Sequence, residues 1–258
     1  FRTPCYNAGM LLALNWKMNP ETLAQALSLL EETKKLMAKA SGKAIVAAPA
    51  IYLRPLIERY KGKALCFATQ NIHTEKSGAF TGEISAFQAK DLGCTYTLVG
   101  HAERRMVGET DEDVRKKVGA ALAADLSPVI CIGEKLRDAH SGEHLEAIRS
   151  QLTSALAEVG PPSAKKIIVA YEPVWAIGAK EPMKASEMHE TTIFIRKILW
   201  EKYDKAALKV PILYGGAILD ETHATLMMKE SEVNGFLLGR ASVDIERLRT
   251  LINALGRL

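Results

Sequence analysis

Short apolar runs alternate with longer amphipathic stretches along the whole chain. The first run, residues 11–14, precedes residues 21–40, where Leu23, Leu27 and Leu30 recur at the spacing of a helix face. The same succession occurs eight times and predicts eight strand–helix units. The predicted strands cover residues 11–14, 44–48, 64–68, 96–100, 129–132, 167–171, 212–214 and 235–238. The predicted helices cover residues 21–40, 52–60, 84–92, 111–124, 144–159, 186–200, 220–228 and 243–254.

The predicted strands are uninterrupted apolar runs, which is typical of parallel strands buried on both faces. Eight such units in 258 residues favour an α/β fold of the closed (β/α)8 barrel type, with residues 10–258 as a single domain. An open, doubly wound sheet is the alternative, but the glycine fingerprint of nucleotide-binding sheets is missing after the first strand. Residues 1–9 are polar apart from a few positions, contain Pro4, and are interpreted as a leader or an expression remnant.

Composition narrows the range of partners. The net charge is +4, with 34 basic and 30 acidic residues intermixed, so we expect a small anionic substrate rather than nucleic acid. No apolar run reaches the roughly 18 residues of a membrane span, so we expect no membrane partner. The four cysteines lie far apart without metal-ligand spacing, and we interpret them chiefly as reduced core thiols of a cytoplasmic protein.

Polar residues follow several of the predicted strands directly. Asn15 and Lys17 follow the first strand, His101 the fourth and Glu172 the sixth. Each has an ordinary alternative, such as a solvated lysine, a core histidine or a surface carboxylate. Because the carboxyl ends of barrel strands meet at one mouth, four such residues together favour an active site.

Residue type suggests a division of labour among them. Glu172 precedes Pro173 and a glycine-containing segment, so it is the candidate base for a C–H proton beneath a lid. His101 precedes a predicted helical turn, whose positive end favours a neutral ring that donates to a substrate oxygen. Lys17 supplies positive charge for an anion. Glycines allow backbone N–H groups to approach a phosphate closely, and the candidates are Gly178, Gly216 and Gly239.

Six segments, in order, carry a resemblance to a known family. They are residues 15–19 (NWKMN), 78–83 (GAFTGE), 99–104 (VGHAER), 131–134 (CIGE), 170–178 (AYEPVWAIG) and 214–216 (YGG). With them, the chain resembles the triosephosphate isomerases from about residue 11 to its end. The resemblance implies interconversion of dihydroxyacetone phosphate and D-glyceraldehyde 3-phosphate through an enediolate, in glycolysis and gluconeogenesis, without metal or organic cofactor.

The resemblance also implies roles for individual residues. Glu172 moves the proton, His101 polarises the carbonyl, Asn15 and Lys17 steady the oxyanions, and Glu103 pairs with Lys17. The implied phosphate site comprises Asn15, Lys17, Gly178, Gly215, Gly216, Ala217, Gly239 and Arg240. The implied lid comprises Pro173, Val174, Trp175, Ala176, Ile177, Gly178, Ala179 and Lys180.

Several positions depart from the usual family pattern. The lid departs from Ala179 onward and is about three residues shorter before the next helix. Ala217 and Ala102 stand where serines are usual, and Arg240 replaces a glycine. Arg240 either offers its guanidinium to the phosphate or, as we favour, presents only its backbone N–H.

The resemblance further implies a homodimer, in which the loop of residues 70–83 inserts beside the partner's Asn15 and Lys17, with Thr81 near its tip. A flexible surface loop is the alternative. Two other functions stay open. One is another phosphosugar enzyme of barrel fold, such as an aldolase with Lys17 as Schiff-base nucleophile. The other is a family member with impaired catalysis.

Overall fold

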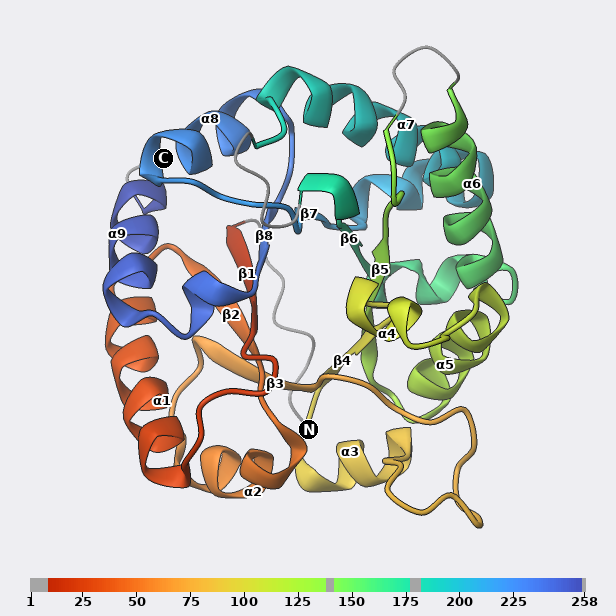
Figure 1. Ribbon diagram of the computed structural model, residues 1–258. Coiled ribbons are helices and arrows are strands. Elements are labelled where there is room, and N and C mark those ends of the chain that lie inside the picture. The colour runs from red at the N-terminus through yellow and green to blue at the C-terminus, as the bar shows by residue number, and fades with distance from the viewer. Residues whose placement is uncertain (1–8, 138–141, 177–181, 257–258) are drawn as a thin grey trace.

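The eight strands close into a parallel barrel, which confirms the predicted fold (Figure 1). The computed structural model describes residues 9–137, 142–176 and 182–256. Each strand pairs in parallel with the next, and β1 pairs with β8 in register Leu12 to Phe236 to complete the ring. The strands are β1 (Met10–Asn15), β2 (Gly42–Ala47), β3 (Leu65–Thr69), β4 (Tyr96–Val99), β5 (Ser127–Ile132), β6 (Ile168–Tyr171), β7 (Ile212–Tyr214) and β8 (Gly235–Leu238).

Helices surround the barrel and connect successive strands (Figure 1). The α-helices are α1 (Leu23–Met37), α2 (Ala50–Arg59), α3 (Ala86–Leu92), α4 (Ala102–Met106), α5 (Asp111–Ala123), α6 (Glu143–Leu156), α7 (Ala185–Tyr203), α8 (Glu221–Glu230) and α9 (Ile245–Leu255). Short 3-10 turns are η1 (Pro161–Lys166), η2 (Val174–Ala176), η3 (Asp204–Lys209) and η4 (Arg240–Ser242).

Capping side chains set where several helices begin. The side chains of Thr22, Ser85 and Thr110 each accept a hydrogen bond from the backbone N–H of the third residue of the following helix. The side chain of that third residue in turn accepts the backbone N–H of the capping residue. These capping boxes place the starts of α1 and α3 two residues later than the apolar spacing predicts. Helix α3 stops at Gly93, whose φ of 107° lies in the left-handed region that favours glycine.

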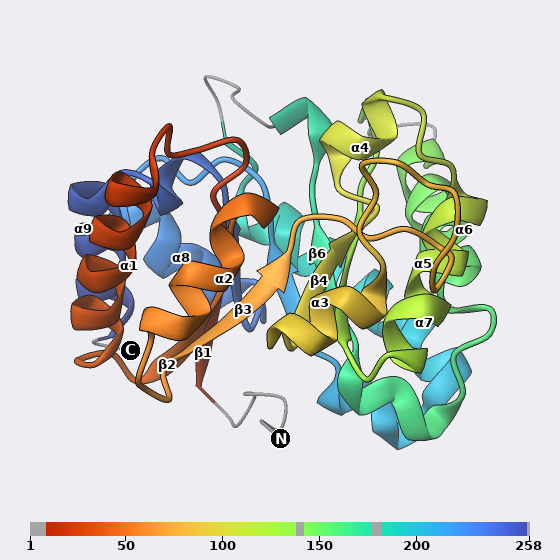
Figure 2. The same cartoon turned by 90° about the horizontal axis from the view of Figure 1, so that it is seen from below.

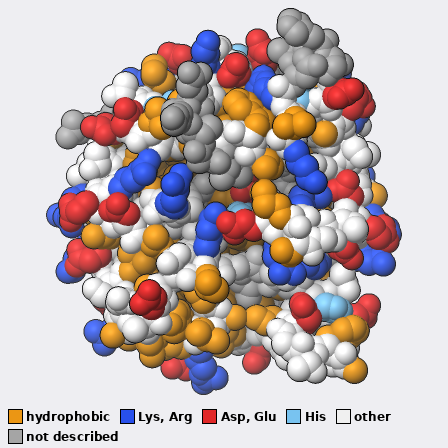
Figure 3. Space-filling model, viewed as in Figure 1, with side chains coloured by type: hydrophobic (Ala, Val, Ile, Leu, Met, Phe, Trp, Pro, Cys, Tyr) orange, Lys and Arg blue, Asp and Glu red, His pale blue; other side chains and the backbone are white. Residues whose placement is uncertain are grey.

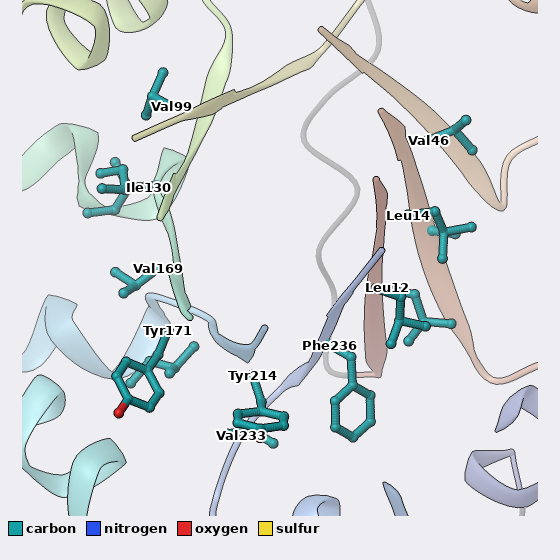
Figure 4. Packing of buried hydrophobic residues seen from close by; sticks show 14 of the residues in the cluster. Leu12, Leu14, Val46, Val99, Ile130, Val169, Tyr171, Tyr214, Val233 and Phe236 are labelled. Atoms are coloured by element: carbon teal, nitrogen blue, oxygen red, sulfur yellow. The ribbon is translucent and has the colours of Figure 1, made fainter. Parts of the chain in front are cut away.

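Alternate side chains of the strands build two separate layers of core. One set points into the barrel and includes Leu11, Ile45, Leu98 and Leu213. The other set points outward against the helices, as Figure 4 shows for residues such as Leu14 and Val46. Because both layers are almost fully buried, every strand is apolar on both faces, and this explains the uninterrupted apolar runs in the sequence.

The cysteines require a correction. Cys94 and Cys131 are buried free thiols, as predicted. Cys66, which points into the barrel and is 2% exposed, is instead half of a disulfide, so the interpretation as a reduced thiol is wrong for it. Cys5 lies outside the described residues. Sequence spacing could not reveal this bond, because disulfides join residues that the fold, not the chain, brings together.

Two further predictions concern the ends and the surface. The leader proposed for residues 1–9 lies outside the described residues except for Gly9, and the domain boundary stays a prediction. In the described part of the chain, no helix combines the length and apolar character that crossing a membrane requires.

Candidate active site

A cavity of about 250 Å³ opens at the carboxyl ends of the strands. Helix α4 and the turn η2 lie together at this end of the barrel, at the top of Figure 2. The cavity brings together most of the residues expected from sequence. It is lined by Asn15, Lys17, His101, Glu103, Glu172, Gly215, Gly216, Ala217, Gly239 and Arg240, among others.

Glu172 follows β6 directly, and its side chain is 3% exposed. Its backbone N–H donates to the carbonyl of Ile132 at 2.7 Å, so the residue continues the sheet. Two glycines make room for it: a Cβ on Gly215 would lie 2.8 Å from Glu172 Cγ, and one on Gly133 would lie 1.9 Å from its carbonyl oxygen. The carboxylate is therefore packed into a space that only glycine neighbours allow.

The carboxylate of Glu172 is held by the start of α4. Its Oε2 accepts the backbone N–H of Ala102 at 3.1 Å, and its Oε1 lies 3.1 Å from Nε2 of His101. Ala102 has no hydroxyl to offer, so the backbone N–H takes the place that a serine side chain could otherwise fill.

The hydrogen bonds of His101 indicate which ring nitrogen carries the proton. Its Nδ1 accepts the backbone N–H of Glu103 at 3.2 Å, so Nδ1 is unprotonated. The proton of the neutral ring therefore lies on Nε2, where it donates to Glu172. The side-chain Nδ2 of Asn15, which is also a donor, lies 3.2 Å from the same Nε2, so this contact is not a hydrogen bond when Nε2 carries the proton. The ring thus aims its only N–H into the cavity, as a group that polarises a substrate oxygen must.

Lys17 extends from the end of β1 across the cavity. Its Nζ pairs with Glu103 Oε1 at 2.5 Å, and the lysine side chain is 31% exposed. Its φ of 52° is unusual for a residue with a side chain. Asn15 supports this backbone by accepting the Lys17 N–H at 3.0 Å.

Gln70, at the end of β3, braces the same region. Its Nε2 donates to the carbonyls of Lys17 at 2.7 Å and Ala47 at 2.9 Å. The left-handed residue is thus fixed from two strand ends.

The first part of the lid is anchored below the cavity. In η2, the indole N–H of Trp175 donates to Glu134 Oε1 at 2.7 Å, and the buried Tyr171 hydroxyl donates to the same oxygen at 2.8 Å. The backbone N–H of Val174 donates to the Glu134 carbonyl. Of the expected lid, Ile177, Gly178, Ala179 and Lys180 lie outside the described residues.

The loops after β7 and β8 present free backbone donors. Within the described residues, the N–H groups of Gly216, Ala217, Gly239 and Arg240 have no hydrogen-bond acceptor. A Cβ on Gly216 would lie 2.2 Å from the Tyr214 hydroxyl, so this turn requires glycine. Such unpaired N–H groups around a cavity suit an anion.

Burial and nearby charge disfavour ionisation of neighbouring groups. Burial, with the Glu172 charge next in importance, raises the pKa of the Cys131 thiol well above its usual value. Burial and then Glu134 raise the pKa of the Tyr171 hydroxyl. Both groups therefore stay neutral near pH 7. Among the described side chains, no group of three or more His, Cys, Asp or Glu is arranged to hold a metal ion.

Sequence reasoning missed three residues that shape the site. Gln70 and Glu134 brace the base of the cavity, and Arg247 of α9 lines it. Gln70 and Glu134 follow strands, a signal that could have drawn attention to them. Arg247 lies on a helix and had no such signal. The predicted loop residue Thr81 is exposed and lies away from the cavity.

Comparisons with known proteins agree with this geometry. The sequence model described as triosephosphate isomerase matches residues 10–255. Triosephosphate isomerase of Endomicrobium trichonymphae is 40% identical over 244 residues, covering 94% of this chain and 97% of the relative. The crystal structure of triosephosphate isomerase from Bartonella henselae has a TM-score of 0.84 and 33% identity, covering 96% of this chain and 99% of that one. The chain belongs to the triosephosphate isomerase family.

Proposed function

We propose that the described cavity carries out the family's reaction, the interconversion of dihydroxyacetone phosphate and D-glyceraldehyde 3-phosphate. The observation that supports it best is the buried pair of Glu172 and neutral His101, with the Nε2–H proton between them. A carboxylate and a neutral donor side by side are what a proton transfer beside a carbonyl requires.

Glu172 takes a proton from the carbon next to the carbonyl and leaves an enediolate. It then returns the proton to the other carbon, so the carboxylate is regenerated. His101 donates Nε2–H to the carbonyl oxygen as charge develops there and takes up the proton of the neighbouring hydroxyl oxygen, so a proton also passes from one oxygen to the other and the neutral ring is regenerated. Lys17 and Asn15 stabilise the same charge. Before substrate enters, Glu172 holds both the Nε2–H of His101 and the N–H of Ala102. Substrate must therefore displace the carboxylate from these two donors.

The phosphate is bound by backbone N–H groups of the two loops after β7 and β8. Gly215, Gly216 and Ala217 form the first loop, and Gly239 and Arg240 the second. Glu103 orients the Lys17 ammonium through the ion pair between them. Gly178 and the lid from Pro173 to Lys180 complete the phosphate site and exclude water.

An aldolase that forms a Schiff base on Lys17 is less well supported. That chemistry needs a desolvated, deprotonated amine. The Lys17 side chain is 31% exposed and pairs with a carboxylate, both of which favour the ammonium. A family member with impaired catalysis is not favoured either, because Asn15, Lys17, His101 and Glu172 are all present around one cavity.

A coupled assay on D-glyceraldehyde 3-phosphate tests the proposal. We expect the wild type to isomerise it, and Glu172→Asp to lower kcat by roughly 10²–10⁴-fold because the base is withdrawn from the carbon. Glu146→Asp, on the exposed surface of α6, is the matched control and should behave as wild type. No isomerisation by the wild type would defeat the proposal.

We also propose a homodimer in which the loop of residues 70–83 approaches the partner's Asn15 and Lys17, with Thr81 near the contact. The loop projects at the lower right of Figure 1. The cytoplasm is the proposed compartment on the basis of the family's glycolytic role alone, because the disulfide at Cys66 removes the argument from reduced cysteines.

A further inference from the structure

Two arginines line the cavity at the loops that close its phosphate side. Arg240 begins η4 and is exposed, whereas Arg247 lies in the first turn of α9 and is half-buried. Figure 3 shows basic side chains gathered beside the mouth, over the connection from β8 to α9. Lys17 is the third cation of the cavity, but Glu103 neutralises it.

Arg247 differs from Arg240 and Lys17 because its guanidinium donates to backbone carbonyls. Its Nη2 donates to the carbonyl of Ile218 and, at 3.1 Å, to the carbonyl of Leu219. Among the described residues, no carboxylate forms an ion pair with it. The guanidinium therefore keeps its full charge while it ties α9 to the loop after β7.

Ser242 and Arg247 together link the segments that follow β1, β7 and β8. The Ser242 hydroxyl lies 2.6 Å from the Gly239 carbonyl oxygen and 3.1 Å from the Asn15 carbonyl oxygen, so its single proton is shared between acceptors at the ends of β8 and β1. Arg247 extends this link to the end of β7 through Ile218. The unpaired N–H groups of both loops are consequently held at a fixed separation.

The loop that Arg247 holds carries no polar side chain at Gly215, Gly216 or Ala217. Ala217 provides no hydroxyl, so this loop offers only its backbone N–H groups to an anion. The hydrogen bonds from Arg247 to the carbonyls of Ile218 and Leu219 polarise the peptide groups to which these carbonyls belong. The positive charge of Arg247 itself lies at the cavity wall.

We propose that Arg247 is a positioning and specificity-determining residue for the phosphate: it fixes the loop after β7 against α9 and supplies, beside Arg240, a positive charge that has no carboxylate partner among the described residues and that favours a phosphorylated substrate. The proposal rests on the proposed function of the cavity. It assigns to α9 a part in binding beyond covering the barrel.

The test compares Arg247→Met and Arg247→Lys with Arg249→Met. Arg249 is two residues along the same helix, forms ion pairs with Glu246 and Glu32, and does not line the cavity, so it is the matched control. For Arg247→Met we expect KM for D-glyceraldehyde 3-phosphate to rise about tenfold, with kcat within about twofold of wild type. Arg247→Lys should recover part of the loss, because it restores the charge. Arg249→Met should leave both constants unchanged.

Two readouts separate positioning of the phosphate from a general structural role. Inorganic phosphate should inhibit Arg247→Met about tenfold less strongly than wild type. Glyceraldehyde, which lacks the phosphate, should be isomerised with an unchanged kcat/KM. Equal losses with both substrates, or an unchanged KM and phosphate inhibition in Arg247→Met, would overturn the proposal.

The outcome stays distinguishable from failure of the proposed function. If the wild type did not isomerise the substrate, titration calorimetry with inorganic phosphate would still compare wild type with the variants. Weaker phosphate binding in Arg247→Met alone would then support the inference. If Arg247→Met failed to fold, as judged by circular dichroism, Arg247→Gln, which keeps an N–H donor but removes the charge, would decide: a raised KM and weaker inhibition by phosphate support the proposal, and wild-type values of both count against it.

Discussion

His101 shows how one backbone contact sets the chemistry of a side chain. The N–H of Glu103, in the first turn of α4, donates to Nδ1 and leaves the proton on Nε2. That proton faces Glu172. A neutral donor and a base are thus positioned by the turn that follows β4. The backbone N–H of Ala102, in the same turn, holds the carboxylate of Glu172.

Arg240 departs from the expected family pattern, and we expect its side chain to contribute little to binding. Its side chain is exposed, whereas its backbone N–H lies in the row of unpaired donors. We expect Arg240→Gly to raise KM for D-glyceraldehyde 3-phosphate less than about threefold, because glycine keeps the N–H. Steady-state kinetics at fixed ionic strength measures the change. A rise of about two orders of magnitude would mean that the guanidinium contacts the phosphate directly.

At the scale of elements, apolar periodicity predicted the strands and long helices well. It could not find α4, since five residues are too few to show a helical period, but the helical turn predicted after His101 on other grounds is confirmed by α4. Some helices begin later than apolar spacing predicted. Helix α1, for example, begins after Thr22, whose side chain accepts one of the first backbone N–H groups, and apolar spacing carries no information about such a cap.

The turn η2 lies two residues after Glu172, the proposed base, within the first part of the proposed lid, and Glu134 anchors it. Trp175→Phe removes the indole N–H and leaves Glu134 with the Tyr171 hydroxyl. We expect the free energy of unfolding to fall by about 1.5 kcal/mol, since a bond to a charged acceptor is lost. We also expect KM to rise about threefold to tenfold, because the first part of the lid loses its attachment. Chemical denaturation and steady-state kinetics measure the two effects.

Tyr171→Phe is the matched control for this prediction. It removes the other donor to the same Glu134 oxygen, but from within β6 rather than from the lid. It should cost similar stability and change KM less than Trp175→Phe does. Equal changes in KM for both variants would show that Glu134 acts through general stability and not through the lid.

At the scale of the whole molecule, the topology explains what the sequence could predict of the site. A closed parallel barrel gathers every strand end at one mouth, so Asn15, His101 and Glu172 could be placed together from their positions alone. Gln70 could have been noticed because it directly follows β3, whereas Arg247 acts on backbone carbonyls of the loop after β7, a contact that leaves no periodic or spacing signal. The disulfide at Cys66 escaped prediction for the same reason.

The loop from β3 to α3, which we propose meets a second copy of the chain, has internal contacts of its own. The rings of His73 and Phe80 stack with centroids 4.0 Å apart, and Gly78 adopts a φ of 148° beneath them. Large exposed hydrophobic side chains occur on this loop and on neighbouring segments, and Figure 3 shows such side chains along the lower edge of the face, where Figure 1 places α2. They include Met18, Ile51, Phe80 and Phe87.

A rigid loop beside exposed apolar surface is typical of an interface. We therefore expect sedimentation velocity to show a dimer, and Thr81→Arg to weaken it by at least about tenfold, because a charge would be buried without a partner. The monomer formed should be less active, since the partner's loop no longer supports Lys17. Leu226→Arg, on the exposed face of α8, is the matched control and should leave the dimer intact. A wild type that sediments only as a fully active monomer would contradict the arrangement, because the loop would then have no partner to complete.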